Sequence, residues 1–435
     1  MRKLDLSSIP AYQESARRLA SRLLAPYASA KDAEGHLDEI NLYPGLDSIG
    51  PPVSVRVLEE EGELAGEDLG NLGKKAVLDG LVYWEHTAAG EATRLMMGPK
   101  FFITPGILER KLLEMGEAPE AGGPIIPLGL GRRHLAQLIY EIRNLAEEAG
   151  IDPAKALSRQ RMLIIAAEDT MPRLLPLVAK DFRGLFPLSS ARFMTQASFP
   201  GLERQGPSWG YAPGSPLRPH NHGAMVMQKA MDGQLFLASE SGGKEYLTKE
   251  ENLSELGAFQ DLVSYNIEDL DYLTRALDFE TIGLGLRMRE LGHGMMMEIA
   301  ANNPERPIKG GCCAHDPGLG RDVMIESFRL GGLGPGDIRF LNKNFNHYLR
   351  PADTLRRLVD NGGIFMPVAV RDSYVYFQPV QGDLNFLEDT VFFSRRKVAP
   401  LNSLKSPADI SHALGAFRAQ DQQPGFREFA EGLLG

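Results

Sequence analysis

Cysteine and tryptophan are scarce in this chain of 435 residues, which contains two of each. The two cysteines, Cys312 and Cys313, are adjacent. That spacing suits neither a structural disulfide nor a known zinc-binding pattern. A chain without a disulfide framework is typical of a reducing compartment. We therefore expect a cytoplasmic protein in which both thiols are buried in a strand.

Long apolar runs and an excess of positive charge are also missing. No apolar run approaches the ~18 residues of a membrane span, and residues 1–5 lack the apolar core of a signal peptide. The net charge of −10 argues against broad binding to nucleic acid or to an anionic membrane. A nucleotide ligand is still possible, because a local basic pocket can lie within an acidic surface. We expect neither nucleic acid nor a membrane as a partner.

The composition that remains is that of a globular protein, with 43% hydrophobic and 24% charged residues. The length is sufficient for two or three domains. Residues 162–166 form a β-branched apolar run typical of a strand buried on both faces. Residues 135–149 carry apolar side chains at helical spacing. Strands alternating with helices in this way predict an α/β domain with a mostly parallel sheet.

The most informative stretch is residues 81–106, LVYWEHTAAGEATRLMMGPKFFITPG. A β-forming run at its start leads into small residues, which allow backbone N–H groups to approach an anion closely. Arg94 and Lys100 add two positive charges beside this loop. Amides, cations and little side-chain bulk are what a triphosphate requires. The alternative is an ordinary strand-to-helix turn with a surface arginine and lysine.

This stretch resembles the signature loop of the UDP-sugar and UDP-N-acetylhexosamine pyrophosphorylases, L-A-G-G-x-G-T-R-L-G followed by P-K. The chain looks like a divergent, bacterial-type member. The residues that it shares with the pattern are Ala88, Gly90, Thr93, Arg94, Leu95, Pro99 and Lys100. Ala89, Ala92 and Met96 stand where the family has glycine. Where φ is positive, each such replacement costs ~1–2 kcal/mol.

The resemblance implies a doubly wound, mostly parallel α/β sheet of the nucleotide-diphospho-sugar transferase type (GT-A-like). It implies a helical N-terminal segment 1–65, a nucleotidyltransferase domain 66–385 and a small C-terminal segment 386–435. The implied reaction joins a nucleoside triphosphate, UTP or another, to a sugar 1-phosphate and releases pyrophosphate, with Mg²⁺ as cofactor. Arg94 and Lys100 would be catalytic by stabilising phosphate charge. Ala89, Gly90 and Thr93 would bind the nucleotide.

Two later segments match the family in the expected order. Gln196 stands where the family has a glutamine that contacts uracil. A side-chain amide offers both the donor and the acceptor that a uracil edge requires. Alternatively, Gln196 is a polar residue at a strand end. In the segment PHNHGAM, Gly223 matches a glycine near the base, and Asn221 and His222 are expected to contact substrate. Asn221 replaces a glycine, and asparagine tolerates a left-handed backbone better than most residues. His220 and His222 lack a third ligand nearby, so we expect substrate contact rather than zinc.

The resemblance assigns magnesium to an acid after the predicted strand 261–266, either Glu268 or Asp269. Two acids at a strand end suit a hard cation; alternatively, they cap a helix predicted over 270–277. An asparagine-rich turn at 340–347 would lie near the sugar, with Asn344 and Asn346 offering donors and acceptors to hydroxyls.

One further departure lies near the C-terminus. Asn402 stands where the family has a phosphate-binding lysine. Lys397, Lys405, Arg395 or Arg396 are the alternatives for that role.

Two other functions remain open. The lost glycines and Asn402 favour a catalytically impaired relative that binds nucleotide sugars without turnover. Asp269 and Asp271 form the D-x-D pattern of a glycosyltransferase on the same architecture. A Walker loop, a serine elbow and a metalloprotease motif are absent from the sequence, which argues against those classes.

Overall fold

The computed structural model describes residues 3–65, 68–92, 95–119, 122–239, 242–305, 307–396, 404 and 407–434, except for the side chains of residues 63–65 and 344. Across these ranges, no helix is long and apolar enough to cross a membrane. The predicted positions Thr93, Arg94, Lys397, Asn402 and Lys405, and the side chain of Asn344, lie outside this description.

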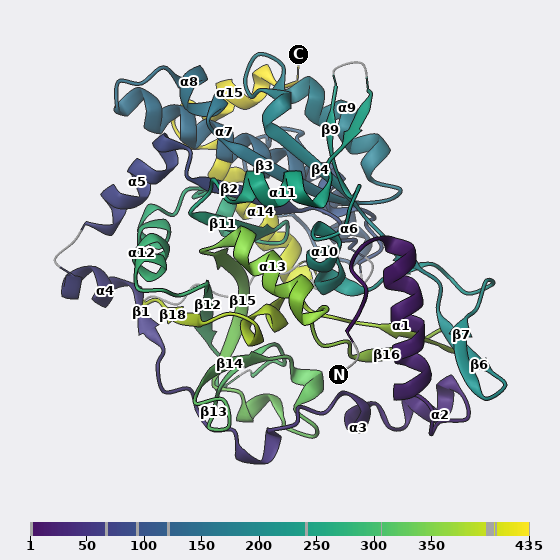
Figure 1. Cartoon of the computed structure of the whole chain (residues 1–435). Coiled ribbons are helices and arrows are strands. Elements are labelled where there is room, and N and C mark those ends of the chain that lie inside the picture. Colours follow the sequence, from purple (N-terminus) through teal and green to yellow (C-terminus); the bar gives the residue numbers. More distant parts are fainter. Residues whose placement is uncertain are drawn as a thin grey trace.

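One large twisted sheet runs through the molecule (Figure 1) in the order β1-β18-β12-β15-β11-β2-β3-β4-β9-β10, and the hairpin β13-β14 extends it beside β15. Strands β11, β2, β3 and β4 are mutually parallel, whereas β15 and β9 join them antiparallel. The bounds are β1 Arg56–Val57, β2 Val82–Thr87, β3 Arg161–Ala167, β4 Ala191–Gln196, β9 Leu235–Ala238, β10 Lys244–Tyr246, β11 Asp261–Asn266, β12 Met295–Ala301, β13 Cys312–Asp316, β14 Arg321–Ile325, β15 Phe340–Tyr348 and β18 Thr390–Ser394. The predicted α/β fold with a mostly parallel central sheet is confirmed.

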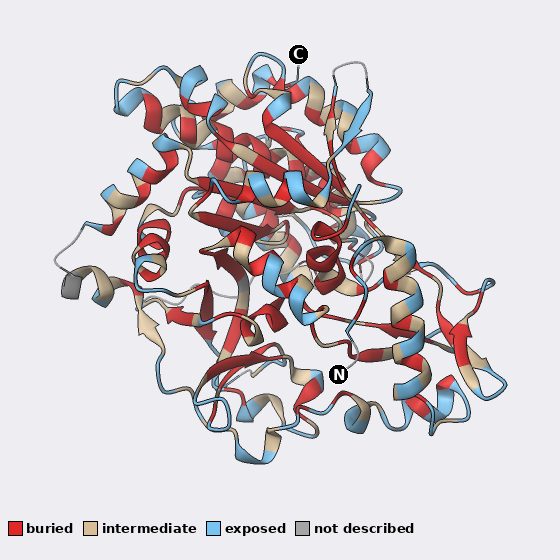
Figure 2. Cartoon of the chain, viewed as in Figure 1, coloured by how far each residue is buried: buried red, intermediate tan, exposed pale blue. Residues whose placement is uncertain are grey.

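Strand β3 shows why the sheet is buried on both faces. Its side chains alternate between two hydrophobic cores, with Met162, Ile164 and Ala166 in one and Leu163 and Ile165 in the other. Successive side chains of a strand point to opposite faces, so an apolar run without polar interruption requires cover on both. Figure 2 shows this buried centre, whereas exposed residues lie on the covering helices, the loops and the edge strand β10.

Helices cover both faces of the sheet. The helices that contribute to the core containing Met162, Ile164 and Ala166 are α5 Leu69–Asp79, α6 Pro105–Glu114, α7 Leu130–Glu148, α8 Pro153–Ser158, α9 Met171–Phe182, α12 Phe279–Glu290 and α14 Pro407–Asp421. Those on the opposite face, in front of the sheet in Figure 1, include α1 Ile9–Leu23, α10 Asn221–Lys229, α11 Lys249–Leu256 and α13 Pro351–Asn361. The remaining helices are α2 Ala30–Glu34, α3 Leu37–Asn41, α4 Leu58–Ala65 and α15 Phe426–Gly432.

The chain order of the parallel strands reverses beside β2. From β2 the chain adds β3 and then β4 on one side, and later adds β11 on the other. At such a switch point the loops leaving neighbouring strands diverge to opposite faces, which opens a crevice at the carboxyl ends of the strands. The fold therefore places the candidate site at the ends of β2, β3, β4 and β11.

The two terminal segments meet the same sheet. β1, from the first 65 residues, pairs in parallel with β18, from the last 50. Helix α1 packs on the hairpin β6 Leu202–Gln205 and β7 Ser208–Tyr211, where Trp209 donates to the Leu24 carbonyl at 2.9 Å. That hairpin forms a small sheet with β16 Val368–Arg371 and β17 Tyr374–Phe377, and β5 Ser198–Phe199 pairs with β8 Arg218–Pro219. The proposed division at residues 65 and 385 stays a prediction.

Two local predictions were wrong. The asparagine-rich turn expected at 340–347 is strand β15, because its backbone pairs with both β11 and β12. The helix expected at 270–277 is a single 3₁₀ turn, Asp271–Leu273. The prediction that Cys312 and Cys313 are buried in a strand is confirmed, and both thiols are free.

Candidate functional site

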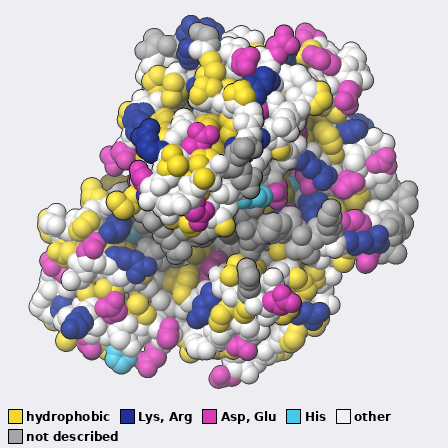
Figure 3. Space-filling model, turned by 180° about the vertical axis from the view of Figure 1, so that it is seen from behind, with side chains coloured by type: hydrophobic (Ala, Val, Ile, Leu, Met, Phe, Trp, Pro, Cys, Tyr) yellow, Lys and Arg dark blue, Asp and Glu magenta, His cyan; other side chains and the backbone are white. Residues whose placement is uncertain are grey.

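A pocket of about 860 Å³ opens where the switch point predicts it. Its wall takes residues from the ends of all four parallel strands: Thr87 of β2 with Gly90 beyond it, Ala167 of β3 with Glu168 beyond it, Gln196 of β4, and Tyr265 and Asn266 of β11. We call this cavity the strand-end pocket. On the face of the molecule in Figure 3, Lys and Arg side chains are interspersed with Asp and Glu side chains rather than forming one basic field.

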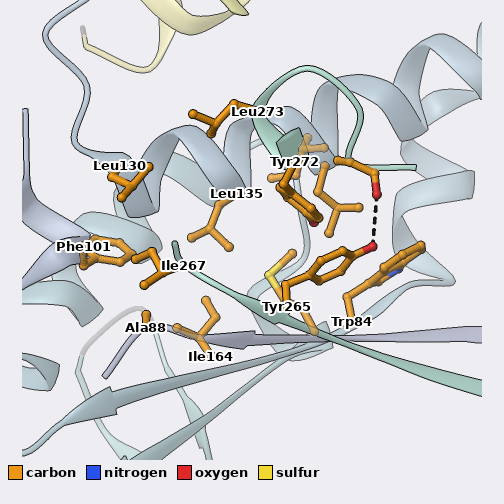
Figure 4. Packing of buried hydrophobic residues seen from close by; sticks show 14 of the residues in the cluster. Trp84, Ala88, Phe101, Leu130, Leu135, Ile164, Tyr265, Ile267, Tyr272 and Leu273 are labelled. Carbon is orange, nitrogen blue, oxygen red and sulfur yellow. Dashed lines mark hydrogen bonds between the residues drawn. The ribbon is translucent and has the colours of Figure 1, made fainter. Parts of the chain in front are cut away.

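The three glycine replacements in the loop after β2 have three different settings. Ala92 is 3% exposed and belongs to the hydrophobic core, as does Ala88, whose side chain lies near Phe101 and Ile267 in Figure 4. Ala89 lines the pocket with a backbone that is not left-handed. Met96 alone has a positive φ, 54°, and its side chain is 85% exposed. The expected strain therefore applies to one replacement of the three.

Lys100 is brought to the pocket by the return of the same loop. Its backbone N–H donates to the Gly90 carbonyl at 3.0 Å, and its side chain runs past Gly90. A Cβ on Gly90 would lie 3.2 Å from Lys100 Nζ, so glycine leaves room for the amine at the pocket wall. Lys100 is buried, and its amine forms an ion pair with the carboxylate of Glu268.

The two candidate magnesium ligands, Glu268 and Asp269, follow β11 but do not line the pocket directly. Glu268 reaches it through Lys100. Asp269 Oδ1 accepts the Asp271 N–H at 3.2 Å, a local contact before the 3₁₀ turn Asp271–Leu273, and the helix that it was expected to cap is absent from the described residues 270–277. Burial raises the pKa of Asp269 to about 6, and the Lys343 ammonium opposes that shift. In the described part of the chain, no group of three His, Cys, Asp or Glu side chains is placed to hold a metal.

Gln196, Asn221 and His222 form the opposite wall. Gln196 Nε2 donates to the Asn221 carbonyl at 3.3 Å, which leaves the Gln196 carbonyl oxygen as an acceptor. Asn221 has a φ of 54°, so the prediction that asparagine fits a left-handed position here is confirmed. His222 Nδ1 accepts the Gln381 N–H at 2.9 Å. Burial lowers the pKa of His222 to about 4, so at neutral pH its proton is on Nε2, where it can be donated.

Gly223 lies behind this wall rather than in it. Its N–H donates to the Pro379 carbonyl at 3.0 Å. A Cβ there would lie 2.5 Å from the Pro379 carbonyl carbon, so only glycine allows α10 to approach this backbone. The contact of Gly223 with a nucleotide base stays a prediction.

A buried polar network forms the floor of the pocket, and the sequence reading missed it. Glu85 of β2 accepts from Ser264 Oγ at 2.8 Å and forms an ion pair with Lys229, and both charged side chains are at most 4% exposed. Gln381 Nε2 donates to Ser264 Oγ at 3.2 Å and contacts the Tyr348 hydroxyl. The sequence did carry a signal for this network, because Glu85 lies within the apolar strand β2 and Lys229 ends the largely apolar helix α10.

Asn346 also lines the pocket. It is 4% exposed, and its Oδ1 has no hydrogen-bond partner within the described chain. A buried acceptor without a partner costs ~1–3 kcal/mol, so this oxygen is suited to a donor that a ligand supplies.

The described cations of the pocket wall are already paired with carboxylates before any ligand arrives. Lys100 is paired with Glu268, and Arg218 with Asp372. Arg395, an alternative phosphate ligand by sequence, is instead held by Asp278 at 2.6 Å and Glu298 at 3.0 Å. The carboxylates that line the pocket without an ion pair among the described side chains are Glu91, Glu168 and Asp169.

An open cavity at the switch point of an α/β sheet is where folds of this class bind their ligands. No family model matches the chain, and no curated protein matches its sequence. The fold is similar to UDP-N-acetylglucosamine pyrophosphorylase from Trypanosoma brucei, with a TM-score of 0.60 and 14% identity over 96% of this chain and 85% of that one. It is also similar to UDP-glucose pyrophosphorylase from Leishmania major, with a TM-score of 0.54 and 14% identity over 91% of this chain and 78% of that one. The chain therefore has the fold of the UDP-sugar pyrophosphorylases.

Proposed function

We propose that this protein transfers a nucleotidyl group from UTP, or another nucleoside triphosphate, to a sugar 1-phosphate. The observation that carries the proposal is the pairing of fold and site. A chain with the fold of these pyrophosphorylases holds Lys100 on one wall of the strand-end pocket and Gln196 on the other. A cavity of about 860 Å³ has room for a nucleotide and a sugar phosphate together.

The chemistry needs positioning more than covalent help from the protein. An oxygen of the sugar 1-phosphate attacks the α-phosphorus of the triphosphate. The bond from that phosphorus to the α,β-bridging oxygen breaks, and pyrophosphate leaves with the electron pair. Lys100 would stabilise negative charge on the transferred and leaving groups, and the small residues Ala89 and Gly90 would allow phosphates to approach the loop. Arg94 is expected to add a second cation.

The opposite wall supplies groups that recognise a base and a sugar. The free carbonyl oxygen of Gln196 accepts an imide N–H of the kind that uracil presents. His222 Nε2–H donates to a carbonyl or hydroxyl oxygen. Asn346 Oδ1 would accept from a sugar hydroxyl and so gain the partner that it lacks.

Magnesium fits the acids at the end of β11. Mg²⁺ is usually held by one or two carboxylates together with substrate phosphates and water, and Glu268, beside Lys100, and Asp269, the next residue, would supply them. When bound, the ion would neutralise phosphate charge. The unpaired acids Glu91, Glu168 and Asp169 make such neutralisation more necessary in this pocket.

A second candidate is a protein that binds nucleotide sugars without turnover. The three unpaired carboxylates and the engagement of Lys100 by Glu268 favour it. The glycosyltransferase reading is weakened because Asp269, half of the D-x-D pattern, is engaged as a turn cap.

Calorimetric titration with UTP and UDP-sugars, with magnesium present, tests the site. Wild type is expected to bind both. Gln196→Ala is expected to weaken both by about tenfold through loss of a base contact. Leu113→Ala, at an exposed position on α6, is the control and should bind as wild type does. Equal affinity of wild type and Gln196→Ala for both ligands would contradict this placement of the base.

A further inference from the structure

A second cavity shares no residue with the strand-end pocket. It has a volume of about 520 Å³. Its walls come from the second half of α7, the end of α9 with the residues that follow it, and α15. We call this cavity the helix-end groove.

The groove gathers three cations in a protein whose net charge is −10. Arg143, Lys180 and Arg183 all line it. Within the described part of the chain, none of the three has a carboxylate oxygen within salt-bridge distance. Lys180 and Arg183 also favour the negative end of α9, where cations are stabilising. The helix dipole of α9 does not explain the position of Arg143, because Arg143 lies on α7.

The base of the groove is apolar and firmly held. Leu185, Phe429 and Leu433 line it, and the Arg143 guanidinium lies 5.4 Å from the centre of the Phe429 ring. The one buried carboxylate there, Asp181, is neutralised by Arg132 through two hydrogen bonds of 2.6 Å. Arg132 also donates to the Leu433 carbonyl at 3.0 Å, which fixes α15 against α7. Glu428 is the remaining acid, exposed on α15.

We propose that the helix-end groove binds a small organic anion, a phosphate monoester that carries an aromatic or other apolar ring. The three unpaired cations match a phosphate group, and the apolar base with Phe429 matches the ring. The volume is that of a small-molecule site. This site is separate from the nucleotidyl transfer proposed above and does not depend on it.

Titration calorimetry with 1-naphthyl phosphate tests the proposal. Wild type is expected to bind it more tightly than either 1-naphthol or inorganic phosphate, because each of these supplies half of the interaction. The double variant Arg143→Gln/Lys180→Gln is expected to lose at least about tenfold in affinity. Arg183→Gln, a single exposed change, should weaken binding several-fold.

Two controls locate the binding. Lys31→Gln/Lys155→Gln removes the same charge from exposed positions on α2 and α8, and should bind as wild type does. Lys100→Gln alters only the strand-end pocket and should leave the groove unchanged. Absence of binding by folded wild type at millimolar probe would overturn the proposal. So would binding that survives the groove double variant and disappears in Lys100→Gln, because the probe would then occupy the strand-end pocket.

Discussion

Lys100 and Glu268 form an ion pair across the mouth of the strand-end pocket. Lys100 follows β2 and Glu268 follows β11, the two strands that flank the switch point. The resemblance gives these residues separate tasks, phosphate binding for the lysine and metal binding for one of two acids. The structure joins them as partners. Under the proposed function, a triphosphate would have to compete with Glu268 for the lysine, and a metal ion would relieve that competition.

The first prediction concerns this competition. Glu268→Gln is expected to bind UTP about tenfold more tightly than wild type when magnesium is absent, because the carboxylate no longer holds Lys100 or repels phosphates. Lys100→Gln should weaken binding and lower turnover by roughly 10²–10³, as loss of an electrostatic donor does. Calorimetry in a chelator and steady-state kinetics measure the two effects. Glu250→Gln on α11 makes the same charge change at an exposed site, and an equal gain there would contradict the account.

The second prediction concerns Met96. Its left-handed backbone costs ~1–2 kcal/mol, whereas a glycine loses about 0.5–1 kcal/mol in chain entropy. Met96→Gly is therefore expected to raise the free energy of unfolding by up to about 1 kcal/mol. Gly98→Ala is the matched control and is expected to lower the free energy of unfolding. Gly98 has a φ of 77° with open space around it, so only the backbone conformation disfavours alanine there. Urea unfolding should show opposite signs for the two variants, and the same sign would refute the strain at Met96.

A third prediction tests the buried floor of the pocket. Lys229→Met leaves the Glu85 carboxylate buried without its counterion and is expected to destabilise the protein by about 3–5 kcal/mol. Glu85→Gln/Lys229→Met should cost less than Lys229→Met alone, since neither charge remains. Lys111→Met breaks a surface pair with Glu114 and should change stability by less than about 0.5 kcal/mol. A double variant that is no more stable than Lys229→Met would show that the pair is not coupled.

The fourth prediction is a pH effect at Glu326. Burial, and then the nearby Asp383 carboxylate, raise the pKa of Glu326 from 4.5 to about 7, while Arg329 opposes the shift. Between these values the folded state holds a proton that the unfolded state has lost, so stability falls as pH rises through the window. From about pH 5 to about pH 8, wild type should lose about 2–3 kcal/mol relative to Glu326→Gln. Urea unfolding of both proteins at the two pH values gives this difference, and parallel behaviour would exclude it.

The fold was largely accessible from the sequence, because local pattern determined its central elements. Helix α7, Leu130–Glu148, contains nearly all of the predicted helical run 135–149, and β3 extends the predicted apolar run by one residue at each end. Strand β15 was mistaken for a turn. Its asparagines have low strand propensity, and its pairing with β11 and β12 joins segments far apart in the chain.

The site was predictable where it follows strand ends and not where it depends on packing. Gln196 and Lys100 both line the pocket, and each was singled out by its place in a segment that resembles the pyrophosphorylase pattern. The buried network joins three residues from distant segments, Glu85, Ser264 and Gln381. Their spacing in the sequence therefore could not predict it. Nor did the sequence show that Lys100 and Glu268, 168 positions apart, meet.

Release of pyrophosphate is the most direct test of the proposed nucleotidyl transfer. The measurement mixes the protein with magnesium, one nucleoside triphosphate and one sugar 1-phosphate, across a panel of both, and follows pyrophosphate in wild type, Lys100→Ala and Arg94→Ala. We expect wild type to release pyrophosphate with at least one pair of substrates, and we expect UTP to be one of the triphosphates that it uses. Both variants are expected to lose this turnover. Folded wild-type protein that binds UDP-sugar yet releases no pyrophosphate with any pair would contradict it and identify a binding protein instead.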